Sequence, residues 1–172
     1  DQMIRKSVIG STSSGDVSRH EAGSLWLDGQ SSSMVAALAR LVAHPSYFQA
    51  DQSNTPFGQG VDNCLDDVLA LGQELGLRSY KDPAGFYGYV ELPGEATANV
   101  IGILCHLDVN APAETGDWFS DLLVLELRNG LLYGCGVQQN KGAVVAALFA
   151  MRALQESGTP IRHTIRLILG LD

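Results

Sequence analysis

Two short segments hold the residues whose types and spacing could do chemistry. His106 and Asp108 follow an apolar run at 100–105 that is typical of a buried strand. Residues i and i+2 of a strand lie on the same side, so the imidazole and the carboxylate leave the strand end facing one way. His106 could bind a metal ion while Asp108 holds its imidazole in place. The second segment reads LYGCGVQQNKG at 132–142 and opens a long apolar helix.

The two segments are similar to the motifs of a known family. The resemblance also rests on CHLDV at 105–109, GDW at 116–118 and HTIRLILGLD at 163–172. Together these stretches resemble the di-zinc metallopeptidases of the aminoacylase, carnosinase and PepV-type dipeptidase family, most closely over residues 99–172. The resemblance implies an N-terminal part of the catalytic domain, in which His106 binds zinc and Asp108 orients the histidine ring.

The chain departs from the family pattern at positions that matter for zinc. The second family motif reads roughly G-R-G-x-x-D-D-K-G, and its bridging aspartate falls on Gln139, followed by Asn140 in place of an acidic residue. An amide oxygen is a poorer zinc ligand than a carboxylate and cannot offset the charge of two cations. The family's Glu-Glu pair would come directly after Asp172, so the general base, a further ligand and the lid domain are absent from these residues. We therefore expect zinc at reduced occupancy or none, and we do not expect Gln139 to be a ligand.

Two hypotheses about function follow from this comparison of motifs. The first is a truncated and degenerate dipeptidase-like domain without hydrolase activity, which is useful as a binding or interaction module. The second is part of an active zinc metallopeptidase that cleaves dipeptides or N-acyl amino acids, with its remaining ligands supplied by a longer chain or a partner. A small peptide substrate is expected only in the second case. Under either hypothesis, an uncovered sheet edge predicts self-association or a protein partner.

Three weaker interpretations use the same residues. A single-metal site with new chemistry has only His106 in its favour. A nucleophilic Cys105 beside that histidine is conceivable, but a buried strand cysteine is commoner. Gly134 and Gly136 before a helix suggest a dinucleotide-binding loop, yet the third glycine of that motif is missing because position 139 is Gln.

Composition and charge exclude some partners. The 172 residues are 45% hydrophobic, which is enough for one domain with a proper core. A formal net charge of −8 disfavours nucleic acid, whose phosphates need a basic face. No apolar run reaches the roughly 18 to 20 residues of a membrane span. The three cysteines have no metal-type spacing, which suggests reduced thiols in the cytoplasm.

The elements that must position the two segments can be predicted from hydrophobic periodicity. Residues 1–33 are rich in Ser and Gly and predict a flexible arm, in which Leu25, Trp26 and Leu27 could pack on the domain or on a neighbour. The partial catalytic domain occupies 34–172. Helices are expected at 34–43, 62–75 and 141–156, and strands at 86–92, 99–106, 122–127, 130–133 and 161–169. This order predicts an α/β, three-layer sandwich with a mostly parallel sheet flanked by helices, truncated relative to the family domain.

Overall fold

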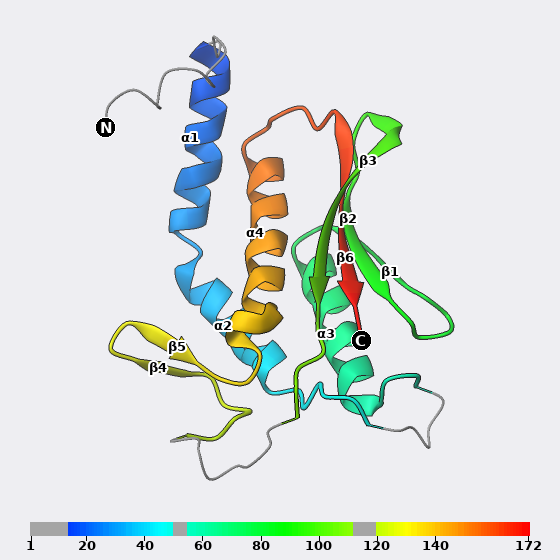
Figure 1. Ribbon diagram of the computed structural model, residues 1–172. Helices are drawn as coiled ribbons and strands as arrows, with labels where there is room; N and C mark the ends of the chain where they lie inside the picture. The colour runs from blue at the N-terminus through cyan, green and yellow to red at the C-terminus, as the bar shows by residue number, and fades with distance from the viewer. Residues whose placement is uncertain (1–13, 50–54, 112–119) are drawn as a thin grey trace, which may run out of the picture.

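The fold is built on one mixed sheet of four strands in the order β1-β2-β6-β3 (Figure 1). The computed structural model describes residues 14–49, 55–111 and 120–172. The strands are β1 (Arg78–Lys81), β2 (Gly88–Leu92), β3 (Ala96–His106) and β6 (His163–Gly170). Only β3 and β6 run parallel, whereas β2 pairs antiparallel with both β1 and β6. The α/β class is confirmed, but the prediction of a mostly parallel sheet was wrong, because a short connection between β1 and β2 can only return antiparallel.

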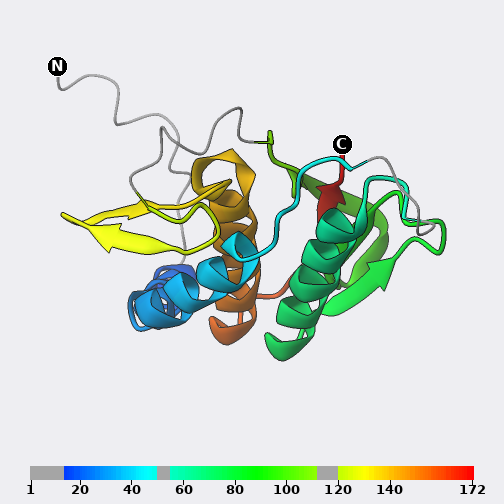
Figure 2. The ribbon, with the colours of Figure 1, turned by 90° about the horizontal axis from the view of Figure 1, so that it is seen from below.

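The main helices cover one face of this sheet (Figure 2). They are α2 (Ser31–Val42), α3 (Gln59–Glu74) and α4 (Gly142–Glu156). Inward side chains alternate along the strands, and Val90, Leu167 and Leu169 are fully buried against the helices. No helix covers the outer face among the residues that the structure describes. That part of the chain therefore forms a sheet with helices on one side, and the second flanking helix layer of the predicted sandwich is not found in it.

Helix α1 (Ser14–Asp28) lies within the region predicted to be a flexible arm. It runs alongside α4, and Trp26 packs against Phe149 with 6.2 Å between the ring centroids. The helices approach closely at Gly23, where an added Cβ would lie 3.3 Å from the Ala153 carbonyl oxygen. Trp26 and Leu27 pack on the core as predicted, while Leu25 is exposed. Residues 14–28 are thus helical, and the division of the chain at residue 33 stays a prediction.

A small hairpin lies apart from the main sheet and consists of β4 (Glu126–Arg128) and β5 (Leu131–Tyr133). Its turn residues Asn129 and Gly130 have φ values of 52° and 78°, which is the geometry that an Asn-Gly turn favours. The hairpin was predicted from that turn. Its first strand is shorter than expected, because residues 121–124 form a turn closed by a bond from the Val124 amide to the Asp121 carbonyl.

The other helix and strand boundaries agree to within a few residues with those predicted from the sequence. Helix α3 ends before Gly76, which adopts φ +75° as a glycine following a helix should. The GDW stretch at 116–118 lies outside the described residues. None of the helices in the described part has the length and apolar character needed to cross a membrane.

Candidate functional site

His106 stands at the end of β3, beside the end of the parallel strand β6. Its backbone pairs with Gly170, so the carboxyl ends of the two strands meet at this edge of the sheet. The His106 Nδ1 atom lies 3.2 Å from Asp108 Oδ1 and 3.1 Å from the Asp108 carbonyl oxygen. Both neighbours are acceptors, which favours the tautomer of the neutral imidazole that has its proton on Nδ1 and its lone pair on Nε2. The pair has the geometry of an oriented metal ligand, and its zinc-binding role stays a prediction.

The second segment begins with a loop and a short π-helical turn, η2 (Val137–Lys141), that leads into α4. Gln139 is exposed, has non-helical φ and ψ of −130° and 93°, and is joined to Asn140 by a cis peptide bond. Gly136 has φ +78°, and an added Cβ there would lie only 2.5 Å from Val109 Cγ1. This close approach requires glycine and brings the loop after His106 against the loop before Gln139.

Residues of both loops line a hollow of about 620 Å³. Val109 and Asn110 contribute from the loop after β3, and the segment 132–139, which includes Gln139, contributes the rest. His106 does not line this hollow, and within the described part of the chain its side chain is hydrogen-bonded to Asp108 rather than to Gln139. The fold therefore brings the two predicted segments together, with the hollow on the Gln139 side.

Two buried polar residues that sequence analysis missed hold these loops in place. Lys141 is fully buried, and its Nζ donates to the His44 carbonyl oxygen at 3.0 Å. Ser46 is also fully buried; its Oγ donates to the Leu107 carbonyl at 2.7 Å, and its own carbonyl accepts from the Val109 amide at 2.8 Å. The segment 44–46 thus connects the loop after His106 to the start of α4. The sequence feature that could have indicated the role of Lys141 is its position as a lone lysine at the start of an apolar helix.

Burial controls the ionisation of this interior. It lowers the pKa of the Lys141 ammonium, because its charged form is poorly solvated there, while the nearby Cys64 and Cys135 act in the opposite direction. Burial also raises the pKa of the Cys64 thiol to about 11 and raises the pKa of Cys105. Both thiols therefore stay protonated at neutral pH, which argues against a nucleophilic Cys105.

The described residues do not provide a complete set of ligands for a pair of zinc ions. Among the described residues, no group of three or more His, Cys, Asp and Glu side chains could hold a metal ion. Within their described parts, the two loops offer the His106 imidazole, whose carboxylate partner is already engaged, the Cys135 thiol and a neutral amide at Gln139. A zinc site normally takes three or four nitrogen, sulfur or carboxylate ligands, so this donor set is incomplete.

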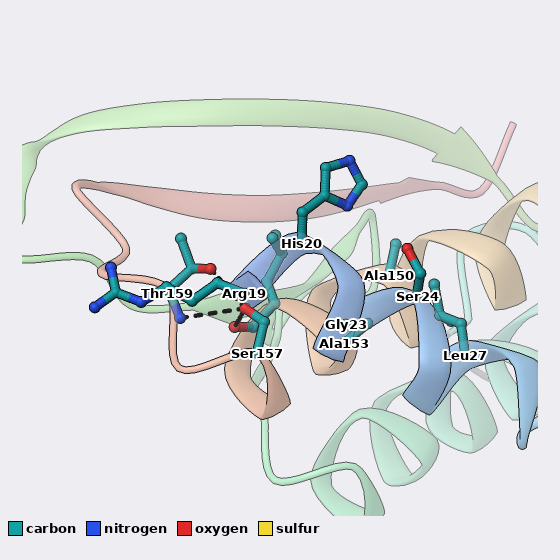
Figure 3. A pocket seen from close by; sticks show the side chains of 10 residues that line it. Arg19, His20, Gly23, Ser24, Leu27, Ala150, Ala153, Ser157 and Thr159 are labelled. Atoms are coloured by element: carbon teal, nitrogen blue, oxygen red, sulfur yellow. Dashed lines mark hydrogen bonds between the residues drawn. The ribbon is translucent and has the colours of Figure 1, made fainter. Parts of the chain in front are cut away.

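A second hollow, of about 520 Å³, lies between α1 and α4 and contains none of the predicted site residues. Figure 3 shows that its wall combines Gly23, Ser24 and Leu27 of α1 with Ala150 and Ala153 of α4. Ser157 and Thr159 at one end are satisfied by hydrogen bonds to each other. Small and apolar residues dominate the wall, as expected where two helices pack at close range, and we assign it no chemistry.

Comparisons with known proteins agree with this geometry. Residues 102–172 match the model of Peptidase family M20/M25/M40. A Bacillus subtilis relative named "Putative dipeptidase YtjP" is 38% identical over 117 residues, which are 68% of this chain and 24% of the relative. A Staphylococcus epidermidis protein, also named as a dipeptidase, is 31% identical over 121 residues, which are 70% of this chain and 24% of that protein. The chain thus spans about a quarter of the length of these relatives.

Solved structures show the same relationship. Human carnosine dipeptidase 1 superposes with a TM-score of 0.72 at 27% identity, over 87% of this chain and 34% of that one. The Saccharomyces cerevisiae di-peptidase Dug1p, at 13% identity and a TM-score of 0.74 over 89% of this chain and 35% of its own, shows the shared fold alone. In sequence and in fold, the chain is therefore similar to the N-terminal part of proteins of Peptidase family M20/M25/M40, and the predicted resemblance is confirmed. The partial coverage fits the N-terminal part of these proteins, and the relatives named above are called dipeptidases.

Proposed function

We propose that this chain is a degenerate zinc-dipeptidase-like domain that does not hydrolyse peptides by itself and serves as a binding or interaction module. The observation that carries the proposal is the pair of amides, Gln139 and Asn140, where the family places acidic residues. A bridging carboxylate neutralises part of the charge of two zinc ions, and a neutral glutamine amide at the same place does not.

The surrounding structure supports a preserved scaffold with altered chemistry. The buried bonds of Lys141 and Ser46 keep both loops in a defined arrangement, so the fold around the site is not collapsed. The His106–Asp108 pair also remains. What has changed is the set of groups that could hold a second cation. For this reason we propose zinc at low occupancy, or none.

The second candidate is an active co-catalytic zinc peptidase of which these residues are one part. The intact His106–Asp108 pair favours it, as does the greater length of the relatives, since further ligands could come from a longer chain or a partner. A dipeptide or an N-acyl amino acid would then be the substrate. For either candidate we propose a cytoplasmic protein, supported by three cysteines that form no disulfide.

Hydrolysis assays on the full-length gene product distinguish the two candidates, because the second candidate takes its remaining ligands from outside these 172 residues. We expect that product, supplied with zinc, to cleave an unblocked dipeptide and an N-acetyl amino acid no faster than its His106→Ala variant does. His163→Ala is the matched control, because His163 is an exposed histidine at the start of β6. Zinc-dependent turnover that His106→Ala abolishes and His163→Ala retains would overturn the proposal in favour of the active peptidase.

A further inference from the structure

The segment 44–46 holds both loops of the candidate site, although it is itself neither helix nor strand. Ser46 binds the loop after His106 through its side chain and its carbonyl, and the His44 carbonyl accepts from Lys141. A segment without a backbone ladder of its own keeps one position only where other elements hold it. Whatever fixes this segment therefore fixes the two loops.

Helix α3 lies along the segment and contacts it through one stripe of side chains. The stripe consists of Gly60, Cys64 and Asp67. These positions are spaced i, i+4 and i+7, which places them on one face of a helix. Gly60 allows a close approach, because an added Cβ there would overlap the Pro45 carbonyl oxygen. The Cys64 side chain lies within hydrogen-bonding reach of the Ser46 side chain.

Asp67 is the charged end of this stripe. Its carboxylate accepts a hydrogen bond from His44 Nε2 at 3.1 Å and forms an ion pair with Arg40 of α2. Burial alone would raise the pKa of the Asp67 carboxyl, but the hydrogen bonds from Arg40 and His44 outweigh it, so this pKa lies below its ordinary value. Asp67 is therefore ionised at neutral pH, and its bonds have the greater strength of charge-assisted hydrogen bonds.

We propose that Asp67 is a positioning residue for the two loops of the candidate site. Through the His44 ring it fixes the segment 44–46, and that segment holds both loops. The inference rests on the proposed function for its meaning, since a binding module needs loops that stay in place after its zinc ligands are lost. The positioning itself is measured without zinc or hydrolysis, so it can fail or hold independently of that function.

Residue-resolved amide hydrogen exchange of the full-length gene product tests the proposal at two amides of one loop. The Val109 amide donates to the Ser46 carbonyl at 2.8 Å, so its protection depends on the segment 44–46. The Leu107 amide donates instead to the Gly170 carbonyl of β6 at 3.0 Å. We expect Asp67→Ala to speed exchange at Val109 by about tenfold or more relative to Leu107. A purely structural role would speed both amides together and leave their ratio unchanged.

Asp66→Ala is the matched control for this ratio. It makes the same substitution one residue earlier on α3, at a side chain that is 59% exposed and pairs with Lys81 at 2.7 Å. The control removes one negative charge from the same helix without touching the segment 44–46. We expect it to leave the ratio of Val109 to Leu107 exchange as it is in the unaltered protein.

His44→Ala approaches the same hydrogen bond from the other side. It removes the ring and keeps the backbone carbonyl that Lys141 uses, so it should raise the ratio about as much as Asp67→Ala does. The double variant should raise it little further, because both substitutions break one interaction.

Three outcomes would overturn the proposal. They are an unchanged ratio in Asp67→Ala or in His44→Ala, an equal rise in Asp66→Ala, and effects of Asp67→Ala and His44→Ala that multiply as independent changes do. Zinc-dependent hydrolysis by the full-length product would instead refute the silent-domain function and leave the positioning role of Asp67 intact.

Discussion

Replacing Lys141 by Ala should lower the free energy of unfolding by about 3–5 kcal/mol. The side chain is fully buried at the start of α4, where it packs in the core and donates to the His44 carbonyl at 3.0 Å. Truncation leaves a cavity and removes one of the two donors to that carbonyl, which keeps the Ser46 amide at 2.8 Å, so the cavity accounts for most of the loss. Urea or thermal unfolding followed by circular dichroism measures the effect.

Lys141→Met separates packing from charge. Methionine keeps most of the volume and removes a charge that burial penalises, so its stability should lie within about 1.5 kcal/mol of the unaltered chain at neutral pH. If Met destabilises as much as Ala, the ammonium and its hydrogen bond hold the loops, and the packing account is wrong. If neither variant is destabilised, Lys141 does not hold the two segments together.

The same residue predicts a pH dependence. Because burial lowers the Lys141 pKa below its ordinary value of 10.5, the unfolded chain binds this proton more tightly than the folded chain does. The resulting penalty is full at pH values below the lowered pKa and disappears as the pH rises towards 10.5. The unaltered chain should therefore gain stability relative to Lys141→Met over that window. A constant difference between the two chains would contradict it.

Restoring the acidic residues should restore zinc binding. We expect the double substitution Gln139→Asp with Asn140→Asp to raise zinc affinity by at least about tenfold, because carboxylates are much better zinc ligands than amides. Titration calorimetry at fixed pH measures the change. Adding His106→Ala to the double variant should remove the gain, because we propose His106 as the imidazole ligand on the neighbouring loop.

Gln138→Asp is the matched control for this gain. Gln138 precedes Gln139 in the same turn, is exposed and lines the same hollow, so the substitution adds a negative charge nearby without occupying the bridging position. Its effect on zinc affinity should be small. If Gln138→Asp raises affinity as much as the double variant does, the gain comes from local charge, and the assignment of Gln139 to the bridging position would fail.

Local patterns predicted the elements that carry strong periodicity. Strands β3 and β6 each contain an apolar run towards their C-terminal end, and α4 is apolar over most of its surface, so each was predicted close to its observed bounds. Strand β1 was missed because its four residues, Arg-Ser-Tyr-Lys, are mostly polar and half exposed. Missing it hid the β1–β2 hairpin, and with it the mixed direction of the sheet.

The candidate site also has one part that local sequence patterns predict and another part that they do not. The proximity of His106 and Asp108 follows from strand geometry over two residues, and their separation agrees with that argument. Lys141 and Ser46 act over separations of 97 and 61 residues, which no local pattern encodes. Helix α1 was missed for a related reason: its Ser and Gly content is typical of a loose arm, and its contact with α4 is what the sequence could not show.

Zinc content tests the central claim most directly. The 172-residue chain, purified without chelator and dialysed against a trace of zinc, should contain well below two zinc ions per chain by elemental analysis, because no group of three or more metal-binding side chains is found among the described residues and Gln139 stands where we place the bridging carboxylate. His106→Ala should lower whatever zinc remains. Two zinc ions per chain, both retained through dialysis, would contradict the account and identify the chain as a complete metal centre.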